Sequence, residues 1–284
     1  MGRYRKILVA VDGSESSLHA LKESFKLASN EKSWITVVSV VPPYMGDLDL
    51  IAVGNVLASA RKPCEDALLK ANKAAKAERA LIKTVCEEGE IHERIIDLAD
   101  AENCDLIVMG RRGMSRLERA LLGNITARVI GYSNKDVLVV PRDTTVGWQK
   151  ILVATDGSRF SKAAAAKAID FAKSYGGELI VISVVDVPTE FYGEAPQIVE
   201  DMVRKAKGFV DDVIKDATAS GIKAEGFVRE AEAYQAITGI AKEQNVNTIV
   251  MGSHGRTGLK RLLMGSVAEK AIGHSPCPVL VVKA

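Results

Sequence analysis

The sequence predicts an α/β protein made of two tandem, doubly wound, five-stranded parallel sheets, each with strand order 3-2-1-4-5. Three observations predict this fold. An apolar strand followed by Asp-Gly-Ser occurs twice, at Lys6–Ser14 and at Lys150–Ser158. Apolar strands alternate with amphipathic helices in each copy. Both copies end on the same apolar run, at Val137–Val140 and at Val279–Val282. We therefore treat the chain as one domain repeated.

Length and charge favour two ordinary globular domains. The 284 residues allow about two domains, which we place at 1–143 and 148–284. The formal net charge is +2, from 38 basic and 36 acidic residues, which gives no case for nucleic acid or an anionic membrane as partner. The apolar runs are too short to span a membrane, and Met1–Lys6 has no signal-peptide body. We expect a cytoplasmic protein.

The four cysteines predict neither a zinc site nor a disulfide framework. They form no Cys-x-x-Cys pair, and no histidine stands near them at metal-ligand spacing. We expect reduced, mostly buried thiols and no metal site built from protein side chains. The four residues are Cys64, Cys86, Cys104 and Cys277.

In the first copy, strands and helices follow one another strictly. Apolar, β-branched runs predict strands at 6–11, 34–41, 82–87, 105–109 and 137–140. Apolar residues at helical spacing predict helices at 15–30, 61–81, 91–103 and 124–132. The connection at 42–58 contains Pro42-Pro43 and is interpreted either as a lid over a ligand or as a surface loop.

The second copy repeats this order. Its strands are predicted at 150–155, 178–185, 222–229, 248–251 and 279–282. Its helices are predicted at 161–175, 197–220, 233–244 and 267–272. The connection at 186–196 is again either a lid or a surface loop. Strict alternation with apolar strands predicts parallel sheets covered by helices on both faces.

Glycines at fixed offsets lie between the fourth strand and the last helix of each copy. In the second copy Gly252, Gly255 and Gly265-Ser266 form the pattern G-x2-G-x9-G-S. Glycine lets the backbone approach a ligand closely. The helix that follows presents free N–H groups and the positive end of its dipole, and Ser266 can cap it or donate to a phosphate oxygen. This arrangement favours phosphate binding, although it is neither a Walker A motif nor a dinucleotide G-x-G-x-x-G.

The predicted sheet order places these loops together. Ligands of doubly wound sheets bind at the carboxyl ends of the strands, where the winding direction reverses. In the first copy that point lies between the strands that precede Asp12 and Gly110, and in the second between those that precede Asp156 and Gly252. Asp-Gly-Ser alone is also good turn chemistry. Its repetition after the first strand of each copy favours the ligand interpretation.

Taken together, the motifs resemble the universal stress protein family over nearly the whole chain. Each copy carries Val-Ala-x-Asp-Gly-Ser, then Met-Gly-x-x-Gly, then the glycine pattern before the last helix. The resemblance implies a Rossmann-like, adenine-nucleotide-binding domain that holds ATP or AMP at the switch point, with a divalent ion (Mg²⁺ or Mn²⁺) bound through the phosphates. It also implies a stress-response regulatory protein whose two halves pair through their last strands.

The resemblance also implies roles for single residues. Asp156 would bind the ribose or the adenine edge, the backbone near Thr155 and Val184 would hold adenine, and the loop glycines would approach ribose and phosphate. The expected nucleotide-binding residues of the second copy are Thr155, Asp156, Val184, Met251, Gly252, Gly255, Gly265, Ser266 and Val267. Those of the first copy are Val11, Asp12, Val40, Gly110, Gly113, Gly123, Asn124 and Ile125.

The two copies depart from the pattern differently. Asn124 stands where the family usually has Ser or Thr, and although it can cap a helix and donate from its amide, it is bulkier. Arg111 and Arg112 are candidate phosphate-facing cations that compensate for the lost hydroxyl. In the second copy Ala268 replaces a frequent hydroxyl residue, which Thr126 retains in the first.

Three classes of function stay open: a nucleotide-binding regulator with an unidentified protein partner, a slow ATPase, and a dimerisation scaffold without nucleotide. The chain lacks Ser-Gly-Gly-x-Asp-Ser and His-x-Gly-His, so we expect at most a slow ATPase and assign no catalytic residue. His254 lies inside the glycine loop either as a general base or as a loop residue that bonds backbone. Arg112 at the matching position argues against catalysis there. A homodimer of whole chains is also open.

Overall fold

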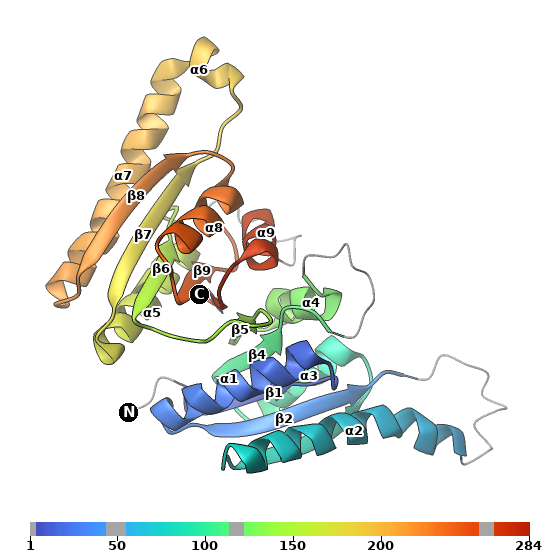
Figure 1. Ribbon diagram of the computed structural model, residues 1–284. Helices are drawn as coiled ribbons and strands as arrows, with labels where there is room; N and C mark the ends of the chain where they lie inside the picture. Colours follow the sequence, from blue (N-terminus) through green and yellow to red (C-terminus); the bar gives the residue numbers. More distant parts are fainter. Residues whose placement is uncertain (1–3, 44–54, 114–121, 256–263) are drawn as a thin grey trace. The chain divides into compact units, whose positions relative to one another are not determined.

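The computed structural model of the chain describes residues 4–43, 55–113, 122–255 and 264–284. It separates into two compact units, Met1–Asp143 and Thr144–Ala284 (Figure 1). The units are described one at a time. None of the helices in the described ranges is long and apolar enough to cross a membrane.

In the described part of the first unit, five parallel strands lie in the order β3-β2-β1-β4-β5. Helices α1 and α2 pack on each other over part of the sheet, and α3 packs on α4. The strands are β1 (Lys6–Ala10), β2 (Trp34–Val41), β3 (Ile82–Glu88), β4 (Leu106–Gly110) and β5 (Asp136–Val140). The helices are α1 (Glu15–Glu31), α2 (Asn55–Ala77), α3 (Ile91–Ala101) and α4 (Asn124–Tyr132).

The described part of the second unit has the same plan, with strand order β8-β7-β6-β9-β10. Numbered within each unit, both orders are 3-2-1-4-5, which confirms the predicted fold. The strands are β6 (Lys150–Ala154), β7 (Glu178–Val185), β8 (Ala224–Glu230), β9 (Thr248–Gly252) and β10 (Val279–Val282). The helices are α5 (Arg159–Tyr175), α6 (Glu190–Glu194), α7 (Pro196–Ala219), α8 (Ala233–Glu243) and α9 (Ser266–His274).

The fully buried strands explain why the sequence forms these sheets. Every residue of β4, β5, β9 and β10 is buried. A parallel strand covered on both faces is expected to be mostly apolar, as these runs of Val, Ile, Leu and Met are after the polar first residues Asp136 of β5 and Thr248 of β9. The edge strands β3 and β8 instead carry half-exposed and exposed residues. Charged edges of this kind discourage unwanted strand pairing.

Several element ends shift by one to four residues, and two larger differences from the sequence prediction concern α2 and α6. Helix α2 begins at Asn55 rather than at residue 61, and it continues through Pro63. Proline is most readily accepted in a first helical turn, so Pro63 in the helix interior is unusual. The short helix α6 falls in the connection that was predicted as a lid or loop, and none of its residues is buried, so apolar periodicity could not reveal it. Residues 44–54 of the matching first-unit connection lie outside the described residues.

The expectation of four reduced thiols is wrong for two of them. Cys64 of α2 and Cys86 of β3 form a disulfide, with their Cα atoms 6.2 Å apart. No local spacing reveals this pair, because packing of the helix on the sheet edge brings the two residues together. Cys104 and Cys277 are buried free thiols, and burial raises the pKa of each to about 11.

Candidate functional site

The predicted site residues of each unit gather at the reversal point of its sheet. Strand β1 lies between β2 and β4, and the chain leaves β1 toward β2 but leaves β4 toward β5. The turn that begins at Asp12 and the loop that begins at Gly110 therefore emerge side by side. In the second unit β6 and β9 place Asp156 and Gly252 in the same way. Parallel α/β sheets bind ligands at this position.

Asp12 and Asp156 each hold a tight turn. Oδ1 of Asp12 accepts the N–H of Ser14 at 3.0 Å, and Oδ1 of Asp156 accepts the N–H of Ser158 at the same distance. The glycine between them has φ of +79° in the first unit and +78° in the second, a conformation that glycine adopts without a steric penalty. The turn interpretation of these aspartates is thus realised through one carboxylate oxygen.

The other carboxylate oxygen faces the glycine loop. A Cβ atom on Gly113 would lie 2.4 Å from Asp12 Oδ2, and one on Gly255 would lie 2.8 Å from Asp156 Oδ2. No real Cβ tolerates such contacts, so the carboxylate and the loop backbone can meet only because a glycine stands there. The Asp turn and the second glycine of the motif, more than 95 residues apart in the chain, therefore form one surface.

The first glycine of the motif is needed for packing. A Cβ on Gly252 would lie 2.7 Å from Phe160 Cβ and 2.8 Å from its backbone carbonyl carbon. A Cβ on Gly110 would lie 2.6 Å from Ser16 Oγ. The end of the fourth strand of each unit therefore lies directly against the first turn of α1 or α5.

A backbone hydrogen bond closes the base of each glycine loop. The N–H of Gly123 donates to the Arg111 carbonyl, and the N–H of Gly265 donates to the Ser253 carbonyl, both at 3.0 Å. These bonds fix the start of the last helix against the end of the preceding strand. Residues 114–121 and 256–263, which complete the two loops, lie outside the described residues.

The helices that follow the loops start one residue earlier than the capping interpretation requires. Gly123 and Gly265 are the N-caps of α4 and α9, so Asn124 and Ser266 are first helical residues and neither caps its helix. Within the described part of the chain, neither N-terminus receives a side-chain cap. The first N–H groups of each helix thus keep their capacity to bind an anion.

Nothing in the described protein explains the third glycine. Gly123 and Gly265 have φ of −66° and −64°, which any residue adopts. A Cβ at either position would meet no described atom closer than 3.5 Å, an ordinary contact. Neither packing against the described residues nor backbone conformation therefore demands glycine at this position in either copy.

The contacts of the residues expected around adenine say less about a ligand than those of the glycine loops do. The N–H groups of Val11 and Thr155 donate to the carbonyls of Val38 and Ile182 at 2.8 Å, so these donors serve the sheet. The Thr155 hydroxyl lies 3.4 Å from Ser161 Oγ. The remaining candidates vary in exposure: Val40, Val184 and Ile125 are half-buried, Val267 is exposed, and Met251 is buried within β9.

The glycine loops differ in charge between the units. Arg111 is half-buried, and its burial lowers its pKa, with a further contribution from the neighbouring Arg112. At the matching positions Ser253 is buried, and its Oγ lies 3.1 Å from His254 Nδ1. The His254 ring in turn lies 5.3 Å from the Phe160 ring. These contacts favour a packed loop histidine over a general base. The described residues contain no cluster of acidic, His or Cys side chains able to hold a metal ion.

Sequence reasoning recognised Asp-Gly-Ser as turn and N-cap chemistry but missed the second serine that orders each Asp turn. Ser14 Oγ accepts the N–H of Ser17, and Ser158 Oγ accepts that of Ser161, both at 3.2 Å, so Ser14 and Ser158 are the N-caps of α1 and α5. The hydroxyl oxygens of Ser17 and Ser161 then accept the N–H groups of the two aspartates. The Ser-x-x-Ser spacing after Asp-Gly was the available signal.

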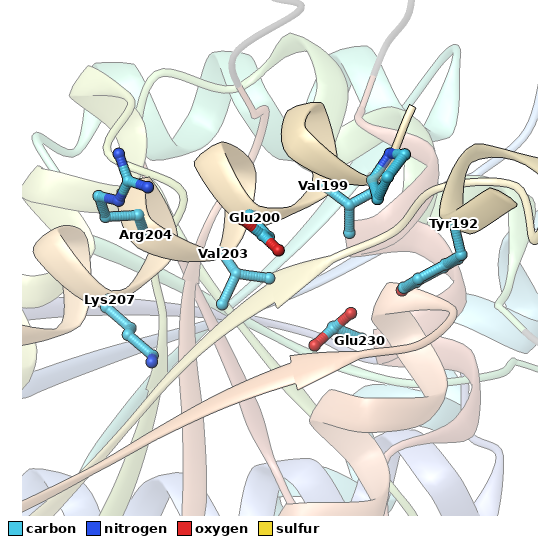
Figure 2. A pocket seen from close by; sticks show the side chains of 8 residues that line it. Tyr192, Val199, Glu200, Val203, Arg204, Lys207 and Glu230 are labelled. Carbon is cyan, nitrogen blue, oxygen red and sulfur yellow. The ribbon is translucent and has the colours of Figure 1, made fainter. Parts of the chain in front are cut away.

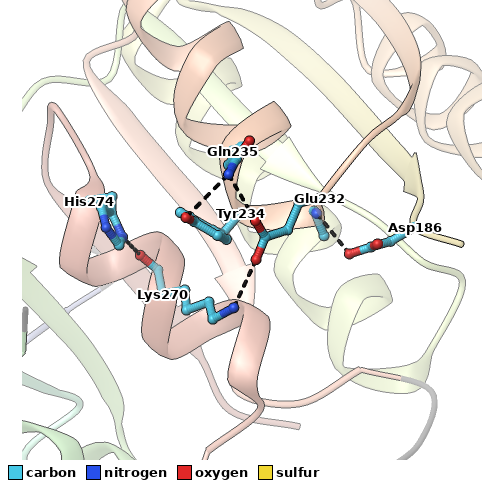
Figure 3. A network of polar contacts seen from close by, with 7 residues as sticks. Asp186, Glu232, Tyr234, Gln235, Lys270 and His274 are labelled. Atoms are coloured by element: carbon cyan, nitrogen blue, oxygen red, sulfur yellow. Dashed lines mark hydrogen bonds and ion pairs between the residues drawn. The ribbon is translucent and has the colours of Figure 1, made fainter. Parts of the chain in front are cut away.

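A second missed feature is a polar network that holds α9 against α8 (Figure 3). Glu232 accepts from Lys270 Nζ at 2.8 Å, and the Asp186 carboxylate, just past the end of β7, accepts the N–H of Ala233 at 3.0 Å. The Tyr234 and His274 rings lie 4.8 Å apart. The first unit has the inverse pair, His92 and Tyr132, at 5.5 Å. Each unit thus joins its last two helices through a His–Tyr contact.

The second unit also has a surface pocket of about 430 Å³ (Figure 2). Figure 2 shows Tyr192 and Glu230 at one end and Arg204 and Lys207 at the other. None of the expected nucleotide-binding residues lines this pocket, which lies at the edge strand β8 rather than at the reversal point. Its lining residues are Tyr192, Pro196, Val199, Glu200, Val203, Arg204, Lys207 and Glu230.

Comparison with known proteins points to one family. The family model described as "Universal stress protein family" matches residues 3–141 and again 147–283. A universal stress protein of Methanocaldococcus jannaschii is 39% identical over 142 residues, which cover 48% of this chain and 82% of that protein. One of Mycolicibacterium smegmatis is 25% identical over 290 residues and covers 98% of this chain and 96% of its own length.

A solved structure gives the same result for the fold. The crystal structure of a universal stress protein from Archaeoglobus fulgidus superposes with a TM-score of 0.75 at 24% identity, over 98% of this chain and 96% of that chain. With a family model matched twice and a likeness that spans both units, the chain belongs to the universal stress protein family as a tandem member.

Proposed function

We propose that the chain is a stress-response regulator that binds an adenine nucleotide, ATP or AMP, at the reversal point of its second unit. The loop that starts at Gly252 and ends at Gly265-Ser266 approaches the phosphates, and the N–H groups of Ser266 and Val267 bind them. Asp156 binds the ribose or the adenine edge. A divalent ion, Mg²⁺ or Mn²⁺, is bound through the phosphates and not by a protein cluster.

The observation that carries the proposal is the uncapped N-terminus of α9 behind Gly265. Among the described residues, neither packing nor backbone conformation requires a glycine at this position, and the helix has no side-chain cap. An anion in front of such a helix gains hydrogen bonds and the favourable end of the helix dipole. The same combination at Gly123 supports this interpretation, since both copies keep it.

Asp156 is suited to a sugar or base donor because its own turn holds the carboxylate in place. Oδ1 accepts from Ser158, while Oδ2 faces Gly255. A carboxylate held by its turn keeps one orientation, and an oriented acceptor selects hydroxyl or amino donors. The half-buried Val184 at the end of β7 offers an apolar surface one strand away.

The first unit is a second candidate site with different chemistry. Asn124 replaces the hydroxyl of Ser266, and Arg111 with Arg112 replaces Ser253 with His254. Two guanidinium groups favour a ligand with several phosphate oxygens. We therefore propose ATP rather than AMP as the better ligand of the first unit, with its affinity to be measured separately from that of the second.

The test is isothermal titration of the full chain with ATP and with AMP, each with and without Mg²⁺. Gly265→Val is expected to abolish binding in the second unit, because its added methyl groups cover the helix N-terminus while its Cβ fits. Asp156→Ala is expected to weaken binding there. Circular dichroism and thermal unfolding check that both variants keep the fold.

The outcomes separate the three function classes. Binding that is lost in Gly265→Val, with phosphate release at background, supports a regulator. Release of phosphate above background that disappears in Gly265→Val would instead support a slow ATPase. Absence of binding to the wild-type chain under all four conditions would contradict the proposal and leave a dimerisation scaffold.

A further inference from the structure

The Cys64–Cys86 disulfide has no counterpart in the second unit, where non-bonded apolar side chains stand at the matching positions. Cys86 pairs with Ser39 across β2 and β3, and Val228 pairs with Ser183 across β7 and β8. Cys86 and Val228 therefore hold matching positions, and both are half-buried.

Cys64 has a matching residue in α7. It lies three residues before Ala67, which faces Gly13, and Ala206 lies three residues before Phe209, which faces Gly157. Cys64 and Ala206 are 3% and 4% exposed. Small apolar side chains therefore suffice for packing at both places, and a bonded cysteine pair adds a covalent link between α2 and β3 that packing does not require.

The link lies beside the candidate nucleotide site of the first unit. Cys86 pairs with Ser39, the neighbour of Val40 on β2. One turn beyond Cys64, α2 contacts the Asp12 turn: Lys70 Nζ donates to the Gly13 carbonyl at 3.3 Å, and a Cβ on Gly13 would lie 3.5 Å from Ala67 Cβ. The bond between helix and sheet thus fixes the part of α2 that supports the Asp12 turn.

We propose that Cys64 and Cys86 form a redox-active site that clamps α2 against the Asp12 turn when oxidised and releases it when reduced, so that the ligand affinity of the first unit follows the thiol redox state. The reactant class is a small dithiol or a dithiol protein. The part of the proposal that concerns affinity rests on the proposed function, because it needs a nucleotide to bind the first unit.

The exchange reaction is balanced. A thiolate of the reductant attacks Cys86 Sγ, a mixed disulfide forms at Cys86, and Cys64 leaves as a thiolate that takes up a proton. The second thiol of the reductant then attacks its own sulfur in the mixed disulfide, and Cys86 leaves and is protonated. The dithiol loses two electrons and two protons and becomes a disulfide, while Cys64 and Cys86 become thiols.

The surroundings of the two sulfur atoms suit this reaction. Cys86 is half-buried and Cys64 is buried, so Cys86 offers the sulfur that a reductant reaches first. The Ser39 carbonyl oxygen lies 3.4 Å from Cys64 Sγ, and the thiol produced by reduction can donate to it. Cys104 and Cys277 are buried with pKa values of about 11, so they form little thiolate and do not compete for exchange.

The test compares the full chain after treatment with dithiothreitol and after treatment with its oxidised form. Thiol counting by mass spectrometry after alkylation under denaturing conditions should find two more free thiols in the reduced sample. Hydrogen exchange should become faster on reduction in residues 12–14 and 59–77. The matched control, Cys64→Ala with Cys86→Val, carries the residues of the second unit at these positions and should show no redox response.

Nucleotide affinity is read one unit at a time. In a Gly265→Val chain, which reports the first unit, reduction is expected to weaken ATP binding about tenfold, a usual size for coupling between sites. In a Gly123→Val chain, which reports the second unit, affinity should not change. The Cys64→Ala, Cys86→Val pair placed in the Gly265→Val chain should bind equally under both conditions.

The outcomes distinguish this proposal from the proposed function. If ATP binds the first unit with equal affinity in both redox states, or if oxidation never removes two thiols, the proposal is wrong. If the first unit binds no nucleotide, the hydrogen-exchange experiment alone tests the clamp. Faster exchange on reduction in the wild type, but not in the double variant, supports the clamp. Unchanged exchange in the wild type contradicts it. Absence of nucleotide binding in both units would contradict the proposed function, and the hydrogen-exchange result would still test the clamp.

Discussion

At the scale of single residues, the site depends on glycines that let a carboxylate approach the loop. In Gly255→Ala the new Cβ would lie 2.8 Å from Asp156 Oδ2, so the carboxylate must turn away from its position. Overpacking of this kind costs about 1–3 kcal/mol, and we expect about tenfold weaker ATP binding in the second unit. Isothermal titration in a Gly123→Val chain measures the effect on that unit alone.

A matched glycine serves as the control. Gly239 lies within α8, where a Cβ would meet no described atom within 4 Å. Gly239→Ala should leave ATP affinity unchanged and stabilise the chain by about 0.5–1 kcal/mol, because alanine restricts the unfolded chain more than glycine does. If Gly255→Ala bound ATP as tightly as Gly239→Ala, Asp156 would have no part in the site.

Because two thiols are buried, the free energy of unfolding should fall as pH rises through the alkaline range. Burial raises the pKa of Cys277 to about 11, whereas an unfolded cysteine titrates near about 8.5. The unfolded chain therefore loses this proton first as pH rises. Stability that is complete below about pH 8.5 is lost progressively up to about pH 11. In urea unfolding over this range, the wild type should lose stability more steeply than Cys277→Ala. Parallel curves for the two chains would contradict the assignment.

Candidate site residues could be predicted only where a suitable residue type recurs at a fixed spacing in both copies. Asp12, Asp156 and the glycines recur at fixed places after recognisable strands, and the structure brings them together at the reversal point. The Cys64–Cys86 bond could not be predicted, because it depends on how α2 packs on the sheet edge. The glycine N-caps were also missed, since Ser266 and Asn124 are the better capping residues by chemistry alone.

At the scale of elements, α5 depends on its serine cap. Ser158 Oγ accepts the N–H of Ser161 at 3.2 Å, and Ser158 also donates its own N–H to Asp156. Ser158→Ala removes an acceptor from the first turn of α5, and we expect a loss of about 1 kcal/mol in the free energy of unfolding. Urea unfolding measures it.

The conservative control keeps the acceptor. Ser158→Asp retains an oxygen that can accept from the helix N-terminus and adds favourable charge there, so its stability should stay near that of the wild type. A Ser158→Ala chain as stable as Ser158→Asp would mean that the cap contributes nothing to α5.

Most elements could be predicted because their apolar periods are strong. The strand limits 34–41 and 178–185 agree with β2 and β7, and the helix limits 124–132 agree with α4. Helix α6 was missed because it has five residues and buries none of them. The early start of α2 was missed because Pro63 is an unusual interior helix residue. Both misses lie in the connection after the second strand or next to it, where packing constrains the sequence least.

At the scale of the whole molecule, one backbone plan carries two chemically different candidate sites. The first unit has Arg111, Arg112 and Asn124 together with a disulfide beside the Asp12 turn, whereas the second has Ser253, His254 and Ser266 and only apolar packing at the matching positions. Experiments on the proposed redox clamp and the proposed nucleotide site can therefore address the two units separately.

The measurement that tests the central claim most directly is a count of bound nucleotide per chain. The protein is equilibrated with excess ATP and Mg²⁺, freed of unbound ligand, denatured gently, and its released small molecules are quantified by mass spectrometry. The account predicts about one adenine nucleotide per chain if the second unit alone binds, or about two if both units bind, with one fewer in Gly265→Val. No adenine nucleotide on the wild-type chain, or an unchanged count in Gly265→Val, would contradict it.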